Sequence, residues 1–121
     1  MRIDRDPGAA GPIVTGFGPR GFRLGEEHHR ALLLTAERAW AWSPPALPDL
    51  RAADLADLIE SGPEFILLGT GPSLARPSRA LVTELEAQGI GLEAMDSRAA
   101  ARAWGVVRGE GREVCAALMA L

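Results

Sequence analysis

The chain has 121 residues, a formal net charge of −3, and 47% hydrophobic against 24% charged side chains. This length predicts one domain, and the composition argues against disorder. All 13 basic residues are arginine, because the sequence contains no lysine, and they are dispersed among 16 acidic residues. A nucleic-acid-binding domain usually carries a clustered basic stripe, so we expect no nucleic-acid partner.

The single cysteine, Cys115, cannot form a disulfide within the chain, so nothing indicates an oxidising compartment. No apolar run approaches the roughly 18 residues of a membrane span. Residues 1–12 carry Asp4 and Asp6 and no apolar run, which fits neither a signal peptide nor a transit peptide. We expect a cytoplasmic protein with a loose segment over residues 1–11 and a single α/β domain over residues 12–121.

The first third of the chain predicts a β-meander, that is, short strands joined by turns. The expected strands are residues 13–15, 22–24 and 31–35. Between them we expect a glycine-rich turn at 16–21 and a polar hairpin tip at 25–29.

Two tryptophans follow the meander. Trp40 and Trp42 are two residues apart, so in a strand they would share one face. The proline-rich segment 43–48 then predicts an extended connector.

The rest of the chain predicts helices that alternate with strands. The first expected helix is capped by Asp49 and runs to about Glu60, the second covers about 78–88, and the third is capped by Ser97 and ended by glycines 109 and 111. The expected strands are residues 65–68, 90–95 and 114–121. The strand–helix–strand unit over 65–95 should form a right-handed parallel crossover.

One loop of this region is a candidate ligand site. It follows a buried strand and leads to a helix, where glycines let a ligand approach the backbone and free N–H groups can hold an anion. The end of the neighbouring strand should open into the same crevice. The candidate ligand-binding residues are Gly69, Thr70, Gly71, Arg76, Asp96 and Arg102. The alternative is a tight structural turn with surface arginines, in which Arg102 pairs with Asp96.

Other patterns favour structural roles. Gly16-x-Gly18-x-x-Gly21 matches a dinucleotide fingerprint, but a strand rather than a helix is expected after it, so a hairpin is favoured. His28 and His29 are adjacent and would point to opposite faces of a strand, which does not build a metal site.

We find no arrangement of residues that predicts a catalytic nucleophile and its base. Cys115 lies in an apolar strand and predicts a buried, inert thiol, with a reactive one as the alternative. We therefore expect no catalytic residue, metal ion or cofactor.

Several segments together resemble a known family through their order and spacing. They are residues 64–71 (EFILLGTG), 89–97 (GIGLEAMDS), 99–102 (AAAR) and 110–112 (EGR), with an early Gly-x-Gly-x-x-x-Phe and a tryptophan that closes the first third. The family includes the mitochondrial complex I (NADH:ubiquinone oxidoreductase) assembly factor 3 and short prokaryotic relatives of unknown function. The resemblance spans about residues 12–120.

This resemblance implies a three-layer α/β fold: a mixed central β-sheet with helices packed on it and an additional antiparallel β layer from the N-terminal meander. It implies no established catalytic activity and, in eukaryotes, a role in the assembly of respiratory complex I. The family's usual Tyr-Asn pair in the third helix is Trp104-Gly105 here. Any chemistry that uses the hydroxyl or amide of that pair would be lost.

Two functions follow from these observations. The first is a non-enzymatic interaction or assembly domain with a protein partner such as a respiratory-chain subunit. It predicts an exposed apolar patch of several hundred Å² that includes a tryptophan. The alternative is a small-molecule or anion-binding protein, or a minor enzyme, that uses the crevice between Thr70 and Asp96. The sequence leaves the oligomeric state open.

Overall fold

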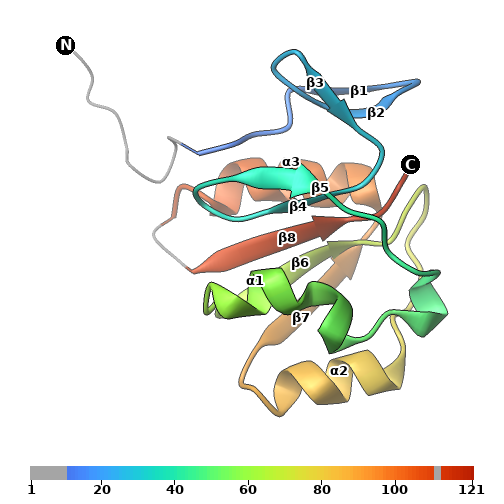
Figure 1. Ribbon diagram of the computed structural model, residues 1–121, viewed down its shortest axis with the longest axis vertical. Helices are drawn as coiled ribbons and strands as arrows, with labels where there is room; N and C mark the ends of the chain where they lie inside the picture. The colour runs from blue at the N-terminus through green and yellow to red at the C-terminus, as the bar shows by residue number, and fades with distance from the viewer. Residues whose placement is uncertain (1–10, 111–112) are drawn as a thin grey trace.

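The computed structural model describes residues 11–110 and 113–121 and is built around a mixed central sheet (Figure 1). The strand order is β5 (Ala39–Ala41), β4 (Leu32–Leu34), β8 (Val114–Leu118), β6 (Phe65–Gly69) and β7 (Gly91–Met95). β8, β6 and β7 are parallel, whereas β4 is antiparallel to both β8 and β5. β7 is therefore an outer strand. The predicted α/β class with a mixed sheet is confirmed.

A separate three-stranded antiparallel sheet forms the additional β layer. Its strands are β1 (Gly16–Gly18), β2 (Gly21–Leu24) and β3 (Glu27–His29). The prediction that the first strand covers residues 13–15 is wrong, because the tight turn at Pro19 and Arg20 pairs Phe17 with Phe22 and so fixes the strand at β1. The glycine-rich fingerprint is thus a hairpin, as expected. The polar tip is shorter than predicted, since Glu27–His29 pairs with β2.

The helical segments are α1 (Ala56–Glu60), α2 (Arg79–Glu86) and α3 (Ser97–Val107), and two short 3-10 turns, η2 (Leu47–Asp49) and η3 (Ala52–Leu55), precede α1. The single helix expected over 49–60 is therefore wrong. Leu50 is fully buried and its backbone is extended, which separates η2 from η3. Asp49 makes no cap, and the Arg51 N–H instead donates to Asp54 Oδ2 at 2.9 Å.

The caps of the two longer helices differ in how well the sequence predicted them. Ser78 caps α2, because its Oγ accepts a hydrogen bond from Leu81 N at 3.1 Å. The cap of α3 is Asp96 rather than Ser97: Asp96 Oδ1 accepts from Ala99 N at 2.9 Å. Ser97 is instead fully buried.

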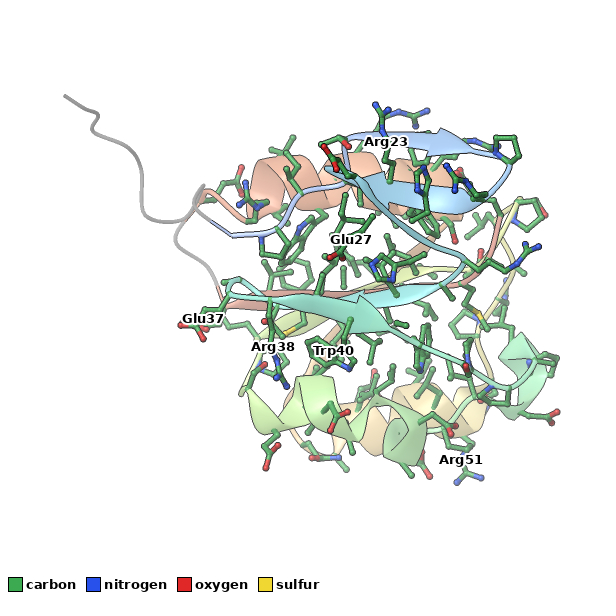
Figure 2. The ribbon with its side chains drawn as sticks, turned by 45° about the horizontal axis from the view of Figure 1, so that its top comes forward. Arg23, Glu27, Glu37, Arg38, Trp40 and Arg51 are labelled. Atoms are coloured by element: carbon green, nitrogen blue, oxygen red, sulfur yellow. The ribbon has the colours of Figure 1, made fainter. Side chains whose placement is uncertain are left out.

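The central sheet is covered on both faces, so the chain packs in layers (Figures 1 and 2). Successive side chains of a strand point to opposite faces. In β6, Ile66 and Leu68 join the core beneath α1 and α2, whereas Phe65 and Leu67 join the core beneath α3 and β2. This explains the continuous apolar run that predicted a buried strand. Trp40 and Trp42 both pack against the core on the α1–α2 side, so they share a face as expected.

The start of the described chain is held against the end of α3. The buried indole of Trp104 donates from Nε1 to Pro12 O at 3.0 Å. Arg108, also buried, donates to the carbonyl of Gly11. The loose segment predicted over residues 1–11 lies outside the described residues except at Gly11, which this contact holds in place. Gly111 and Arg112 also lie outside them.

A substitution at the end of β6 tests how closely the sheet and α3 approach each other. A Cβ on Gly69 would stand 2.7 Å from Ser97 Oγ and 3.1 Å from Leu118 Cδ2. We expect Gly69→Ala to lower the free energy of unfolding by about 1–3 kcal/mol, because atoms must shift to admit the methyl group.

Gly18→Ala is the matched control, since a Cβ there would meet nothing within 4 Å. It should change stability by less than about 0.5 kcal/mol. Urea unfolding followed by circular dichroism measures both variants, and equal stabilities would contradict the close approach.

Candidate functional site

The predicted ligand loop folds onto itself at the carboxyl end of β6. Thr70 is buried, and its Oγ1 donates to Ser73 O at 2.8 Å and accepts from Ala75 N at 3.1 Å. The Thr70 N–H donates to Met95 O at 2.8 Å. The hydroxyl and the backbone N–H of Thr70 are thus used within the protein.

Ser97 fills the space between this loop and the start of α3. Its Oγ accepts from Gly71 N at 2.8 Å and donates to Met119 O at 2.7 Å. Its own N–H donates to Gly71 O at 2.8 Å. The backbone N–H that was expected to hold an anion therefore has a buried partner. On this side the loop has the geometry of the structural turn that the sequence left as the alternative.

The remaining candidate residues lie in different places. Asp96 caps α3 through Ala99 N. Arg76 is exposed and lines a shallow hollow beside Leu74 and Ala94. The Arg102 guanidinium lies 5.9 Å from the centre of the Phe17 ring, and no ion pair within 4.0 Å joins it to Asp96 in the described residues. The structure brings the glycine loop and Asp96 to one edge but leaves Arg76 and Arg102 apart.

The other side of the loop borders a groove of about 490 Å³. It lies where β6 and β8 end, and the proline-rich connector after β5 forms its far wall. Its lining residues include Arg30, Trp42, Pro44, Pro45, Thr70 and Gly71. Asp96 does not line it. The groove is mostly apolar, with the exposed Arg30 as its basic side chain.

A second surface joins the β1–β2 hairpin to the outer side of α3. We call it the arginine face, and it consists of Ile13, Phe17, Arg98, Arg102 and Val106. The exposed fractions of Ile13, Phe17 and Val106 are 43%, 36% and 63%. Three of the exposed apolar side chains of the described residues therefore belong to this face. The patch contains no tryptophan, because Trp104 is fully buried beneath it.

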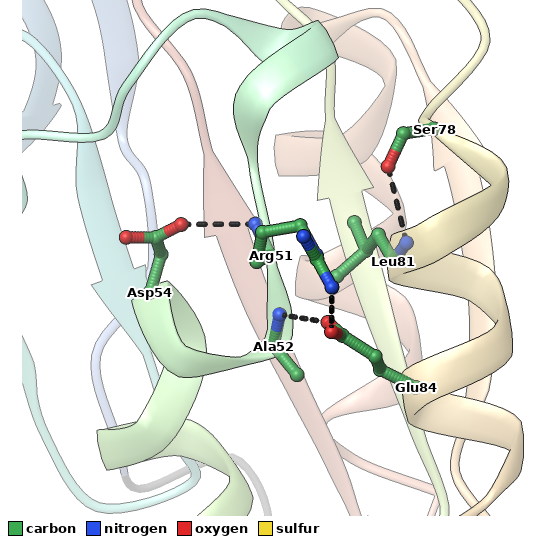
Figure 3. A network of polar contacts seen from close by, with 6 residues as sticks. All are labelled: Arg51, Ala52, Asp54, Ser78, Leu81 and Glu84. Carbon is green, nitrogen blue, oxygen red and sulfur yellow. Dashed lines mark hydrogen bonds and ion pairs between the residues drawn. The ribbon is translucent and has the colours of Figure 1, made fainter.

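The opposite side of the protein carries an ion pair with a structural role (Figure 3). The Arg51 guanidinium contacts the Glu84 carboxylate, whose Oε1 also accepts from Ala52 N at 2.9 Å. The hydrogen bond from Arg51, and then that from the Ala52 backbone, lower the pKa of Glu84. These contacts tie α2 to η3. Another arginine contact lies at β5, where the Arg38 guanidinium is 4.4 Å from the centre of the Trp40 ring; Figure 2 labels both residues.

One of the two histidines of the meander has an acidic neighbour in its own strand. His29 Nε2 lies 3.3 Å from Glu27 Oε1 within β3. In residues 11–110 and 113–121, no three His, Cys, Asp or Glu side chains lie close enough together to hold a metal ion.

Comparison with known proteins decides the family. A family model described as a protein of unknown function (DUF498/DUF598) matches residues 14–119. The chain belongs to this family. An uncharacterized protein of Rhodobacter capsulatus is 40% identical over 118 residues, covering 95% of this chain and 90% of its relative.

Solved structures share the DUF498/DUF598 fold. A Bordetella parapertussis protein is 32% identical with a TM-score of 0.80, covering 93% of this chain and 98% of its own. A Bordetella pertussis protein described as a Mth938-like domain is 27% identical with a TM-score of 0.78, covering 99% and 92%. A Bartonella henselae structure described as an outer membrane protein is 26% identical with a TM-score of 0.77, covering 93% and 97%. In the described part of this chain, no helix is long and apolar enough to cross a membrane.

Two positions of this DUF498/DUF598 chain depart from the pair that the resemblance implies. Trp104 stands where a tyrosine was implied, and its indole N–H binds the Pro12 carbonyl. Gly105 stands where an asparagine was implied, and Ile13 Cδ1 lies 3.8 Å from the place where a Cβ would be. Trp104 therefore holds the N-terminal segment against α3, and Gly105 lies where Ile13 packs on the helix.

Cys115 is buried within β8, as the sequence predicted. Its side chain is 3% exposed, and its Sγ lies 3.1 Å from Ser61 Oγ. Burial raises the pKa of the thiol and outweighs the contact with Ser61, which lowers it. A raised pKa leaves less thiolate at neutral pH, so this cysteine is poorly suited to act as a nucleophile.

The raised pKa of Cys115 predicts an alkaline loss of stability. The chain has no lysine and no tyrosine, so apart from arginine no other side chain titrates in this range. The unfolded chain loses the thiol proton at lower pH than the folded chain. The free energy of unfolding should therefore be constant near pH 7 and decrease above the ordinary pKa of cysteine, by up to about 1.4 kcal/mol per pH unit.

Urea unfolding between pH 7 and 10.5 measures this decrease. Cys115→Ala is the control and should remove most of the slope, whatever its stability at neutral pH. The same slope in both proteins would show that another group causes it.

Proposed function

We propose that this DUF498/DUF598 chain is a non-enzymatic protein-interaction domain of the assembly-factor type. The arginine face carries the proposal, because Ile13, Phe17 and Val106 are exposed together although both faces of the sheet have apolar cover. Gathered exposed apolar side chains are typical of interaction sites. The internal hydrogen bonds of Thr70 and Gly71 support the non-enzymatic part, since they occupy the loop that was the candidate for chemistry.

The more specific proposal is that the chain is a cytoplasmic protein that takes part in the biogenesis of respiratory complex I. It is supported by the resemblance to the family of assembly factor 3, and the family membership is compatible with it. Respiratory-chain subunits are then the expected partners.

Affinity recovery of the tagged full chain from its native host tests this function. We expect respiratory-chain subunits to be recovered with the natural chain and to be reduced by about tenfold or more with Val106→Asp, because the charge would be buried at the contact. Ala80→Asp, at an exposed position of α2, is the control and should leave recovery unchanged.

Deletion of the gene should also lower the amount of assembled complex I. Recovery of specific partners together with an unchanged amount of assembled complex I would contradict only the role in complex I biogenesis. Repeated recovery of no partner would contradict the interaction function itself.

A second candidate function is the binding of a small anionic molecule in the groove beside Thr70 and Gly71. The observation that favours it is the position of this groove at the carboxyl ends of β6 and β8, where open α/β sheets often bind ligands. Its volume of about 490 Å³ is in the range of small-molecule sites. Arg30 would contact the anionic group.

Thermal-shift screening with carboxylic acids, phosphates and nucleotides tests this second function. A ligand of the groove should raise the melting temperature of the natural chain and should do so much less with Arg30→Gln. Arg20→Gln, in the turn of the hairpin, is the matched control. Stabilisation that is equal in all three proteins, or none with any compound, would contradict it.

A further inference from the structure

We infer that the arginine face binds a helical segment of a protein partner that presents two carboxylates one helical turn apart beside apolar side chains. This inference rests on the proposed interaction function and specifies the chemistry of the partner.

The outer side of α3 forms a straight ridge. Arg98, Arg102 and Val106 are spaced at i, i+4 and i+8, so they lie above one another on the helix. All three are exposed, whereas Ala101 and Trp104 on the other side are buried. At 1.5 Å per residue the ridge is about 12 Å long, which matches two turns of a partner helix.

The hairpin fixes both guanidinium groups beside an aromatic ring. The centre of the Phe17 ring lies 5.7 Å from Arg98 Cζ and 5.9 Å from Arg102 Cζ. Phe17 is itself held edge-on by the buried Phe22, with ring centres 6.0 Å apart. Such cation–π contacts orient a guanidinium while leaving its N–H groups free to donate.

The two arginines have no acidic partner within the described protein. No carboxylate of residues 11–110 and 113–121 lies within 4.0 Å of either guanidinium, and nearby Asp96 is occupied as the cap of α3. Arginine binds carboxylates in a planar, two-bonded geometry. Residues at i and i+4 of a partner helix have their Cβ atoms about 6 Å apart, and Arg98 and Arg102 have the same i, i+4 relation on α3.

The apolar members of the face favour a protein over other anionic surfaces. Ile13 and Val106 lie at the end of the ridge away from Arg98, so apolar side chains of the same partner helix would cover them. Recruitment to anionic lipids typically uses clusters of about four to eight basic residues. Two arginines with three exposed apolar side chains fit a mixed acidic and apolar helix better.

Photo-crosslinking of the full chain in its native host tests this inference. Benzoylphenylalanine is placed at Val106, and at Glu86 on α2 as the control position. The expected adduct from position 106 is a protein, and mass spectrometry of the crosslinked peptide should show two acidic residues at i and i+3 or i+4 near apolar residues. Position 86 should give no such adduct.

Charge variants then test the role of the arginines. Arg98→Glu with Arg102→Glu should reduce the adduct by about tenfold or more, and the milder pair Arg98→Gln with Arg102→Gln should also reduce it. Arg79→Glu, at an exposed position of α2, should change it by less than about twofold. Changing the two partner acids to arginine should restore the adduct with the Glu variants. Circular dichroism confirms that each variant is folded.

The outcomes separate the inference from the proposed function. A lipid adduct, a partner peptide without paired acids, or a yield insensitive to the arginines would overturn the inference. Protein adducts only from position 86 would show that a partner binds at α2 rather than at the arginine face, which would overturn the inference and the role of the face but not an interaction function as such. No protein adduct from either position, together with no partner in affinity recovery, would overturn both.

Discussion

The hydroxyl of Ser97 is the contact on which the carboxyl edge of the sheet depends. It accepts from Gly71 N and donates to Met119 O, so one buried atom joins the loop after β6, the end of β8 and the first turn of α3. Gly69 has no side chain, which permits this close approach. Because a buried polar group needs its partners, the same contact makes the Gly71 N–H unavailable to a ligand. On the side of the loop that faces α3, this edge is therefore a joint between elements.

Elements whose signals are local could be predicted from the sequence. The apolar run of β6 indicates burial on both faces, and Ser78 marks the start of α2 in the way that short polar side chains usually do. The predicted strand at 13–15 and the helix at 49–60 failed for different reasons. The strand begins later because the tight turn after Gly18 pairs Phe17 with Phe22, whereas the helix is interrupted because Leu50 is buried in the core among residues far away in the sequence.

The candidate site could likewise be predicted only in part. The position of the glycine loop at the carboxyl end of β6 could be predicted, but its closure by Ser97 joins residues that are 26 positions apart. The arginine face is harder still, since Phe17 and Arg98 belong to different layers of the fold. The i, i+4, i+8 spacing of Arg98, Arg102 and Val106 was the one signal available in the sequence. This spacing indicates a binding surface only once the structure shows Phe17 of the hairpin beside the two arginines.

The outer strand β7 has a consequence for the association of two copies of the chain. Gly91 and Met95 direct backbone groups toward β6, so by alternation Glu93 does too, and the backbone of Leu92 and Ala94 faces outward. If two β7 strands met antiparallel with Leu92 opposite Ala94, each Glu93 would stand opposite its counterpart. Like charges in that position oppose pairing. A single exposed glutamate thus works against edge-to-edge growth of the sheet, a hazard that any open strand brings.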